Sequence, residues 1–216
     1  MRSSRLACLL AAVCVLGLVG CSSASRPLAE LSGTGNPAAL RGDVLNPPTV
    51  AAAIDLPSDL GGRYDLARST HDRITLVYFG YTHCPDVCPT IMADTAQALR
   101  ESSPTVRSKV TVVFVTVDPK RDTMPVLRRW LAHFNPAFVG LRGTIAQVIE
   151  AQRTLDVPVS KVTPRSKNGY TVQHSAELLA FTPDGKAHVL YTDGPTMISD
   201  LRHDLAILAS DKSYGA

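Results

Sequence analysis

A buried strand that ends at a pair of cysteines most constrains what this chain can fold into. Residues 74–79 are β-branched or aromatic and carry too little polarity to face water, which is typical of a central strand covered on both faces. Residues 90–100 are rich in helix formers and have apolar positions on one stripe. Cys84 and Cys88 lie between these two segments. Ligands of open α/β sheets collect at the carboxyl ends of strands, so two thiols there indicate chemistry rather than packing.

Pro85 and Pro89 predict the local geometry of the cysteines. Pro89 lacks an N–H and disfavours the α conformation at Cys88, so we expect the helix to begin near Pro89 with Cys88 at its cap. Both cysteines would then lie on a tight loop beside the positive end of a helix, which lowers the pKa of a thiol and favours thiolate. Thiolate binds soft metals and attacks disulfides. A stapling disulfide is the alternative, although cross-linking so short a loop contributes little stability.

The rest of the chain predicts an α/β fold with a central mixed sheet and helices on both faces. A strand–helix–strand unit that ends at a second buried strand, residues 110–117, implies parallel strands joined by a right-handed crossover. Pro183 and Gly185 predict a turn between two antiparallel strands. The further expected elements are helices at 124–134, 144–155 and 195–209, strands at 138–141, 176–181 and 187–191, and extra strands within 42–66.

Three features of the sequence together resemble one known family. They are FGYTHCPDVCP over residues 79–89, VDPKRDT over 117–123, and a lone His174 ahead of the turn at 183–186. These features are similar to the SCO/SenC family, whose members are thioredoxin-like copper proteins that assist assembly of the dinuclear copper centre of cytochrome c oxidase. The resemblance covers roughly residues 42–210, in keeping with one domain. It implies a thioredoxin-like fold, copper as the metal, and as partners the copper-bearing subunit of cytochrome c oxidase and other copper carriers.

The resemblance also implies a metal-ligand set of Cys84, Cys88 and His174. A histidine in a loop is more often solvated than a ligand, but family analogy places this one against the cysteine loop, where thioredoxins usually carry a cis-proline. Two thiolates and one neutral imidazole suit cuprous copper and can accommodate cupric copper. Zinc is the physical rival, because two cysteines and a histidine with an open fourth position form a known catalytic zinc arrangement.

Residues beside the expected site have less specific interpretations. Asp118, Arg121 and Asp122 follow the second buried strand, and we expect them either to support the metal ligands or to act as turn and cap residues. Gln173 stands where many SCO-like sequences carry an aspartate that could tune the histidine. The preferred oxidation state of the metal therefore does not follow from the resemblance.

Two classes of function are compatible with this site. A copper carrier would use both cysteines and the histidine, and it would be a binding and transfer protein rather than an enzyme. A thiol–disulfide oxidoreductase would use Cys84 and Cys88 to reduce the cysteines of an acceptor protein. We favour the copper carrier and keep the oxidoreductase as the alternative.

The amino terminus has the features of an export signal. Two arginines precede an apolar run over residues 6–20, which is shorter than the about 20 residues that span a membrane and is typical of a signal peptide. Cys21 follows directly and resembles the lipidated cysteine of bacterial lipoproteins; an ordinary signal peptide with a bystander cysteine is the alternative. We expect a signal peptide at 1–20, a lipidated cysteine and flexible linker at 21–41, and a thioredoxin-like domain at 42–216, anchored to the cell membrane outside the cytoplasm.

Cysteine content and net charge limit the compartment and the partners that we expect for the protein. Cys8 and Cys14 would be lost with the signal peptide, so Cys84 and Cys88 would be the free thiols, in an oxidising compartment where a metal or a reductant must protect them. Loss of the two arginines of the signal lowers the formal net charge from +3 to +1. No basic stripe is left, which argues against a nucleic acid partner.

Overall fold

The computed structural model describes residues 40–165 and 169–210, and strands and helices alternate in the middle of that range, from β4 (Ile74–Gly80) to α5 (Ile145–Thr154). The strands are β1 (Asp43–Val50), β2 (Asp55–Pro57), β3 (Arg63–Asp65), β4 (Ile74–Gly80), β5 (Val110–Thr116), β6 (Val139–Leu141), β7 (Lys161–Arg165), β8 (Gly169–Gln173), β9 (Leu178–Phe181) and β10 (Lys186–Tyr191). The helices are α1 (Leu66–Ser69), α2 (Val87–Glu101), α3 (Pro104–Arg107), α4 (Met124–Ala132), α5 (Ile145–Thr154) and α6 (Met197–Ser210).

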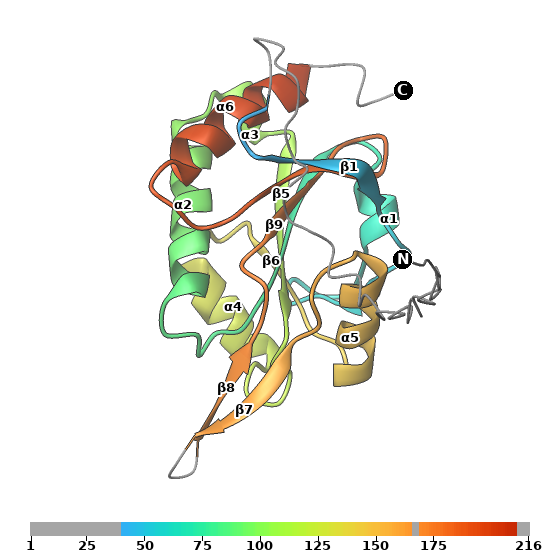
Figure 1. The fold of residues 1–216 in the computed structure, drawn as a ribbon, viewed down its shortest axis with the longest axis vertical. Helices are drawn as coiled ribbons and strands as arrows, with labels where there is room; N and C mark the ends of the chain where they lie inside the picture. The colour runs from blue at the N-terminus through green and yellow to red at the C-terminus, as the bar shows by residue number, and fades with distance from the viewer. Residues whose placement is uncertain (1–39, 166–168, 211–216) are drawn as a thin grey trace, which may run out of the picture. The chain divides into compact units, whose positions relative to one another are not determined.

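One mixed sheet, in the order β1-β10-β9-β4-β5-β6, forms the centre of the fold (Figure 1). Every residue of β4 is buried, as expected for a strand covered on both faces. β4 pairs in parallel with β5 from Ile74↔Val110 to Gly80↔Thr116, and it pairs antiparallel with β9 on its other side. The parallel half and the antiparallel half therefore meet at β4, which ends where the cysteine loop begins.

The helices cover both faces of this sheet, which confirms the predicted fold class. α2, α4 and α6 lie on one face, and α1 and α5 lie on the other (Figure 1). The β4–α2–β5 and β5–α4–β6 crossovers run in the same direction across the sheet, and right-handed crossovers in one direction place their helices on one face.

The amino end of the described chain adds strands, as predicted. β1 pairs antiparallel with β10 at one edge of the sheet, and β2 and β3 form a separate small hairpin. The buried carboxylate of Asp204 in α6 accepts hydrogen bonds from the backbone N–H groups of Arg41 and Gly42, both at 2.9 Å. This carboxylate ties the start of β1 to the last helix.

The start of α2 differs from the prediction, because the helix begins at Val87 rather than near Pro89. Asp86 is the capping residue, and Cys88 lies inside the first turn instead of at the cap. The N–H groups of a first helical turn have no partner within the helix, so a proline as the third residue removes no hydrogen bond. The preference against α conformation before a proline is overridden at Cys88.

The hairpin of β7 and β8 was not predicted. β7 is exposed along its whole length and pairs with β8 from Lys161↔Gln173 to Arg165↔Gly169. In β8, Val172 is the one buried residue. Neither strand therefore carries the run of apolar residues that marks a buried strand. The hairpin lies at the end of the fold where α2 begins, and its second strand leads directly into His174 (Figure 1).

The other predicted boundaries agree within one or two residues, which is the usual uncertainty of an element's end. The predicted signal peptide and Cys21 lie outside the described residues. Within the described ranges, no helix has both the length and the apolar character needed to cross a bilayer.

Candidate metal centre

Three side chains meet beyond the carboxyl end of β4, and they are the three that the sequence singled out. The sulfur atoms of Cys84 and Cys88 and a ring nitrogen of His174 all lie within 4.8 Å of one another. The His174 Nε2 atom is 3.2 Å from the Cys88 sulfur and 3.7 Å from the Cys84 sulfur. In the described part of the chain, no other group of three or more histidine, cysteine or acidic side chains comes together in this way.

The cysteines are held at different depths. Cys84 is half-buried on the loop after β4, where its N–H donates to the Tyr81 carbonyl at 3.1 Å. Cys88 is fully buried in the first turn of α2, and its own N–H points at the Cys84 sulfur at 3.5 Å. The sulfur of Cys88 is therefore fixed by the core, while Cys84 is less deeply buried.

Gly80, the last residue of β4, is the site residue that sequence reasoning missed. A Cβ atom on Gly80 would come within 2.7 Å of the Tyr78 ring and 2.9 Å of the Cys88 sulfur. Glycine at this point lets the buried sulfur pack against the strand backbone. The signal was present as a glycine that ends a buried strand just before a cysteine loop.

The position of His174 fixes which of its ring nitrogens can bind a metal. Its Nδ1 atom lies 2.7 Å from the carbonyl oxygen of Ser175. A carbonyl oxygen only accepts hydrogen bonds, so Nδ1 carries a proton and Nε2 is the ring nitrogen left to bind a metal beside the sulfurs. The rings of Tyr81 and Tyr78 meet the imidazole edge to face, at centroid distances of 5.5 and 6.0 Å. The imidazole is therefore oriented as a ligand before any metal arrives.

The two thiols have opposite acidities. The pKa of Cys84 is lowered to about 3, and the hydrogen bond from the Cys88 side chain is the largest cause. Burial opposes this shift, while contacts with His174 and with the N–H groups of Asp86 and Cys88 add to it. Burial raises the pKa of the Cys88 thiol well above its ordinary value, and the neighbouring Cys84 thiolate raises it further. The reduced site thus holds one accessible thiolate and one buried thiol.

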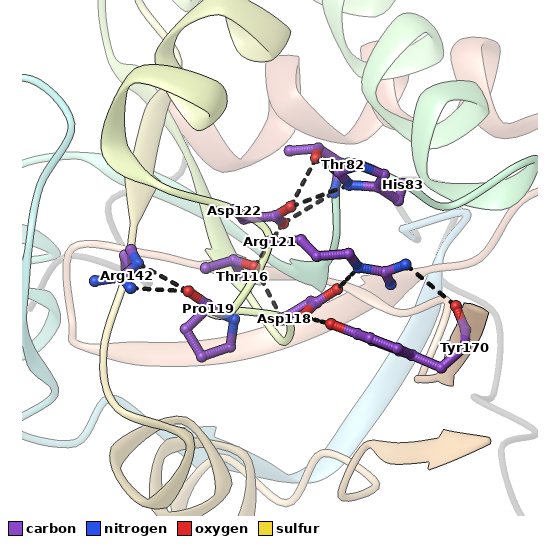
Figure 2. A network of polar contacts seen from close by, with 9 residues as sticks. All are labelled: Thr82, His83, Thr116, Asp118, Pro119, Arg121, Asp122, Arg142 and Tyr170. Atoms are coloured by element: carbon purple, nitrogen blue, oxygen red, sulfur yellow. Dashed lines mark hydrogen bonds and ion pairs between the residues drawn. The ribbon is translucent and has the colours of Figure 1, made fainter. Parts of the chain in front are cut away.

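The segment after β5 supports the cysteine loop through Asp122 (Figure 2). This carboxylate is fully buried and accepts from the Thr82 N–H at 2.9 Å and from the Thr82 hydroxyl at 2.7 Å. The Thr116 hydroxyl donates to it at 2.7 Å. Asp122 therefore fixes the loop two residues before Cys84, which goes beyond a role as a turn or cap residue.

Arg121 and Asp118 contact the β7–β8 hairpin instead (Figure 2). The guanidinium of Arg121 lies over the ring of Tyr170, with its central carbon 3.8 Å from the ring centroid, and its Nε atom donates to the Asp118 carboxylate. The Tyr170 hydroxyl donates to the same carboxylate at 2.8 Å. All three residues expected beside the site thus connect its supporting loops, and none of them contacts the sulfur atoms.

The remaining histidine and glutamine near the site are exposed to solvent. His83 is exposed, with its Nδ1 atom 3.0 Å from the Thr82 hydroxyl and 3.5 Å from an Asp122 oxygen. Gln173 is exposed and is paired in register with Lys161.

The donor chemistry of the cluster fits a soft metal ion. One sulfur is already ionised, the Nε2 atom of the imidazole faces both sulfurs, and the second thiol can lose its proton when a metal binds. Two thiolates and an imidazole suit cuprous copper, and they also suit zinc with an open fourth position. Geometry alone does not separate these two metals.

Comparison with known proteins finds similarity to one family. A family model described as SCO1/SenC matches residues 57–208. The chain is 34% identical over 137 residues to "Protein SCO2 homolog, mitochondrial" from Bos taurus, covering 62% of this chain and 50% of that protein. The chain therefore spans about half the length of such curated relatives.

Two solved structures resemble the fold over most of their own length. The solution structures of apo Sco1 from Thermus thermophilus match with a TM-score of 0.70 and 31% identity, covering 79% of this chain and 97% of that one. The structure of ScoI from Bradyrhizobium japonicum with copper bound matches with a TM-score of 0.64 and 29% identity, covering 74% and 99%.

Proposed function

The chain belongs to the SCO1/SenC family, and from this premise we propose that it is a copper-binding metallochaperone that assists assembly of the copper centre of cytochrome c oxidase. The observation that carries the proposal is the cluster of Cys84, Cys88 and His174, whose donor atoms lie within 4.8 Å of one another. A solved structure similar to this chain, that of ScoI from Bradyrhizobium japonicum, has copper bound, which favours copper over zinc as the metal here.

The environments of Cys84, Cys88 and His174 suit a copper ion that must be bound and then released to another protein. Cys84 offers a half-buried thiolate, and the buried Cys88 loses its proton when the metal binds, so binding releases a proton. His174 is part-buried and closes the site from the β8 side. One sulfur and the imidazole are thus within reach of an acceptor protein, while the second sulfur holds the ion from beneath.

We propose the copper-bearing subunit of cytochrome c oxidase as the acceptor, with other copper carriers as donors. The place of action would be the outer face of the cell membrane, with Cys21 as a lipid anchor.

The unequal acidity of the cysteines favours thiol–disulfide exchange as a second candidate function. An accessible thiolate beside a buried thiol is the arrangement of a reductase. Cys84 would attack a disulfide of the acceptor and form a mixed disulfide, and Cys88 would then displace the acceptor thiolate. The acceptor disulfide would be reduced to two thiols, and the Cys84–Cys88 pair would be oxidised to a disulfide.

Metal analysis of single variants tests the ligand set. The purified full chain should bind about one copper ion, and Cys84→Ser, Cys88→Ser and His174→Ala should each lose most of it, because each removes one of three ligands. His133→Ala is the matched control. That ring is exposed, and its Nδ1 atom lies 3.2 Å from the carbonyl oxygen of Trp130, away from the three ligands in sequence. Full copper content in His174→Ala would remove His174 from the site.

The two candidate functions separate at His174. Attack on a disulfide requires the cysteine pair and no imidazole ligand, whereas a copper carrier needs all three groups. His174→Ala should therefore abolish oxidase maturation in cells that lack the wild-type protein, while thiol–disulfide exchange on a model disulfide largely survives. Maturation by this variant in copper-limited medium would reject the carrier and leave the reductase. A thermal unfolding curve should first show that the variant is folded.

A further inference from the structure

One short segment, residues 118–122, holds both chain segments that carry the candidate ligands (Figure 2). Through Asp122 it binds the backbone and hydroxyl of Thr82, two residues before Cys84. Through Arg121 and Asp118 it binds Tyr170, four residues before His174. The cysteine loop and the histidine are far apart in sequence, so this segment is a physical link that can set the distance between them.

The contact with Tyr170 is made at three points. The guanidinium of Arg121 stacks on the ring at 3.8 Å, and its Nη1 atom donates to the Tyr170 carbonyl at 3.2 Å. Asp118 receives the Tyr170 hydroxyl and the Arg121 Nε atom. Ring, hydroxyl and backbone of Tyr170 are thus all held, which restrains the whole of β8 and not the side chain alone.

The same guanidinium also reaches the ring that borders the imidazole. Its central carbon is 5.6 Å from the centroid of Tyr81, and the Tyr81 ring packs edge to face on His174 at 5.5 Å. Arg121 is therefore linked to His174 by two indirect contacts. One runs through β8, the strand that precedes the histidine, and the other runs through the Tyr81 ring that packs on it.

We propose that Arg121 is a positioning residue for His174. Its planar stack on Tyr170 holds β8 so that the His174 Nε2 atom stays 3.2 Å from the Cys88 sulfur. The inference rests on the proposed function and deepens it, because it identifies what keeps the third ligand in place in a two-stranded hairpin whose outer strand is fully exposed. Isolated hairpins are marginally stable, so β8 needs such a contact to present the histidine at a defined distance.

Lysine cannot replace Arg121 in this role. A lysine keeps the positive charge, but it has neither the planar face that stacks on an aromatic ring nor a fork that reaches the Asp118 carboxylate and the Tyr170 carbonyl together. The Nη2 atom of Arg121 has no hydrogen-bond partner among the described residues, so the stack and the other two nitrogen atoms carry the contact. Arg121→Lys therefore isolates the geometric role from the charge.

A double-mutant cycle on copper affinity tests the proposal in the full chain. Arg121→Lys should lower the affinity by about 10-fold to 100-fold, the range found when a contact that orients a metal ligand is lost. If Arg121 acts through His174, then Arg121→Lys should change the affinity by less than about twofold when His174 is already alanine. Equal losses in both backgrounds would overturn the proposal, because Arg121 would then act on the site independently of His174.

Two further variants calibrate the cycle. Tyr170→Phe keeps the ring beneath the guanidinium and loses the hydroxyl bond to Asp118, so its loss of affinity should lie between those of wild type and Arg121→Lys. Arg129→Lys is the matched control, since Arg129 is an exposed arginine on the neighbouring α4, and it should match the wild type. A loss in Arg129→Lys equal to that in Arg121→Lys would also contradict the proposal.

A second measurement does not depend on copper. In the reduced metal-free protein, nuclear Overhauser contacts between the rings of Tyr81 and His174 should be strong in wild type and in Arg129→Lys, and weakened in Arg121→Lys. Unchanged contacts in Arg121→Lys would overturn the inference. Failure of the wild-type chain to bind copper would instead reject the proposed function, and the ring contacts would still decide the role of Arg121.

Discussion

Cys84 and Cys88 share a site but differ in depth and in protonation state. Cys88 is fully buried, and its thiol donates a hydrogen bond that is the main reason why the pKa of Cys84 is lowered to about 3. The sequence predicted a lowered thiol pKa from the helix start alone. It could not assign the shift to one cysteine, because that depends on which sulfur the core covers.

Alkylation of the reduced, metal-free protein with iodoacetamide checks this assignment. The folded pKa of Cys84 is below its ordinary value, so its thiolate is fully formed above about pH 5, and the alkylation rate should be flat between about pH 5 and pH 8. An ordinary thiol, with a pKa near 9, reacts about tenfold faster for each unit of pH in that range. Cys88→Ala removes the main lowering contact, so its Cys84 should regain a pH-dependent rate. A tenfold rise per unit in the wild type would contradict the assignment.

At the scale of elements, burial decides what could be predicted. β4 and β5 are continuous apolar runs because both faces are covered, and the turn between β9 and β10 carries the residues that its geometry requires, with Gly185 at a φ of +74°. The β7–β8 hairpin has no such pattern, since β7 is exposed throughout. Its structure depends on contacts between residues far apart in sequence, such as Tyr170 and Arg121. Local sequence patterns do not reveal such contacts.

The junction between β1 and α6 gives a prediction at this scale. Asp204 is fully buried and accepts from the N–H groups of Arg41 and Gly42 and from the Tyr191 hydroxyl at 3.0 Å. Asp204→Ala would leave the buried Tyr191 hydroxyl and two part-buried N–H groups without this acceptor, so it should lower the free energy of unfolding by about 3 kcal/mol. Hydrogen exchange should also show faster exchange in β1. Chemical denaturation gives the first quantity and amide exchange the second.

Asp200 is the control for this prediction. It lies on the same helix and is 3.8 Å from the exposed guanidinium of Arg41. Exposed ion pairs contribute little, so Asp200→Ala should lower the free energy of unfolding by less than about 1 kcal/mol. Equal effects of the two substitutions, or unchanged exchange in β1 of Asp204→Ala, would show that Asp204 does not tie β1 to α6.

At the scale of the whole molecule, the candidate site joins segments that only the complete fold brings together. His174 and Cys88 are 86 positions apart, and the pairing of β9 with β4 carries the histidine to the cysteine loop. The sequence alone marked the cysteine pair through its place after a buried strand. Resemblance to a family was needed to select His174 among six histidines, because no local pattern distinguishes it.

The attachment of the chain to the membrane is the prediction that concerns the whole molecule. The apolar run over residues 6–20 is short for a span of about 20 residues and ends directly before Cys21, so we expect cleavage before Cys21 and lipidation of its thiol. Mass spectrometry of the native protein from membranes should find the amino terminus at Cys21 with added acyl mass. Cys21→Ser should lose the acyl mass and leave the washed membrane fraction, whereas Ser22→Ala should keep both, because the adjacent serine carries no thiol. An intact Met1, or an unmodified Cys21 in the wild type, would reject the lipid anchor.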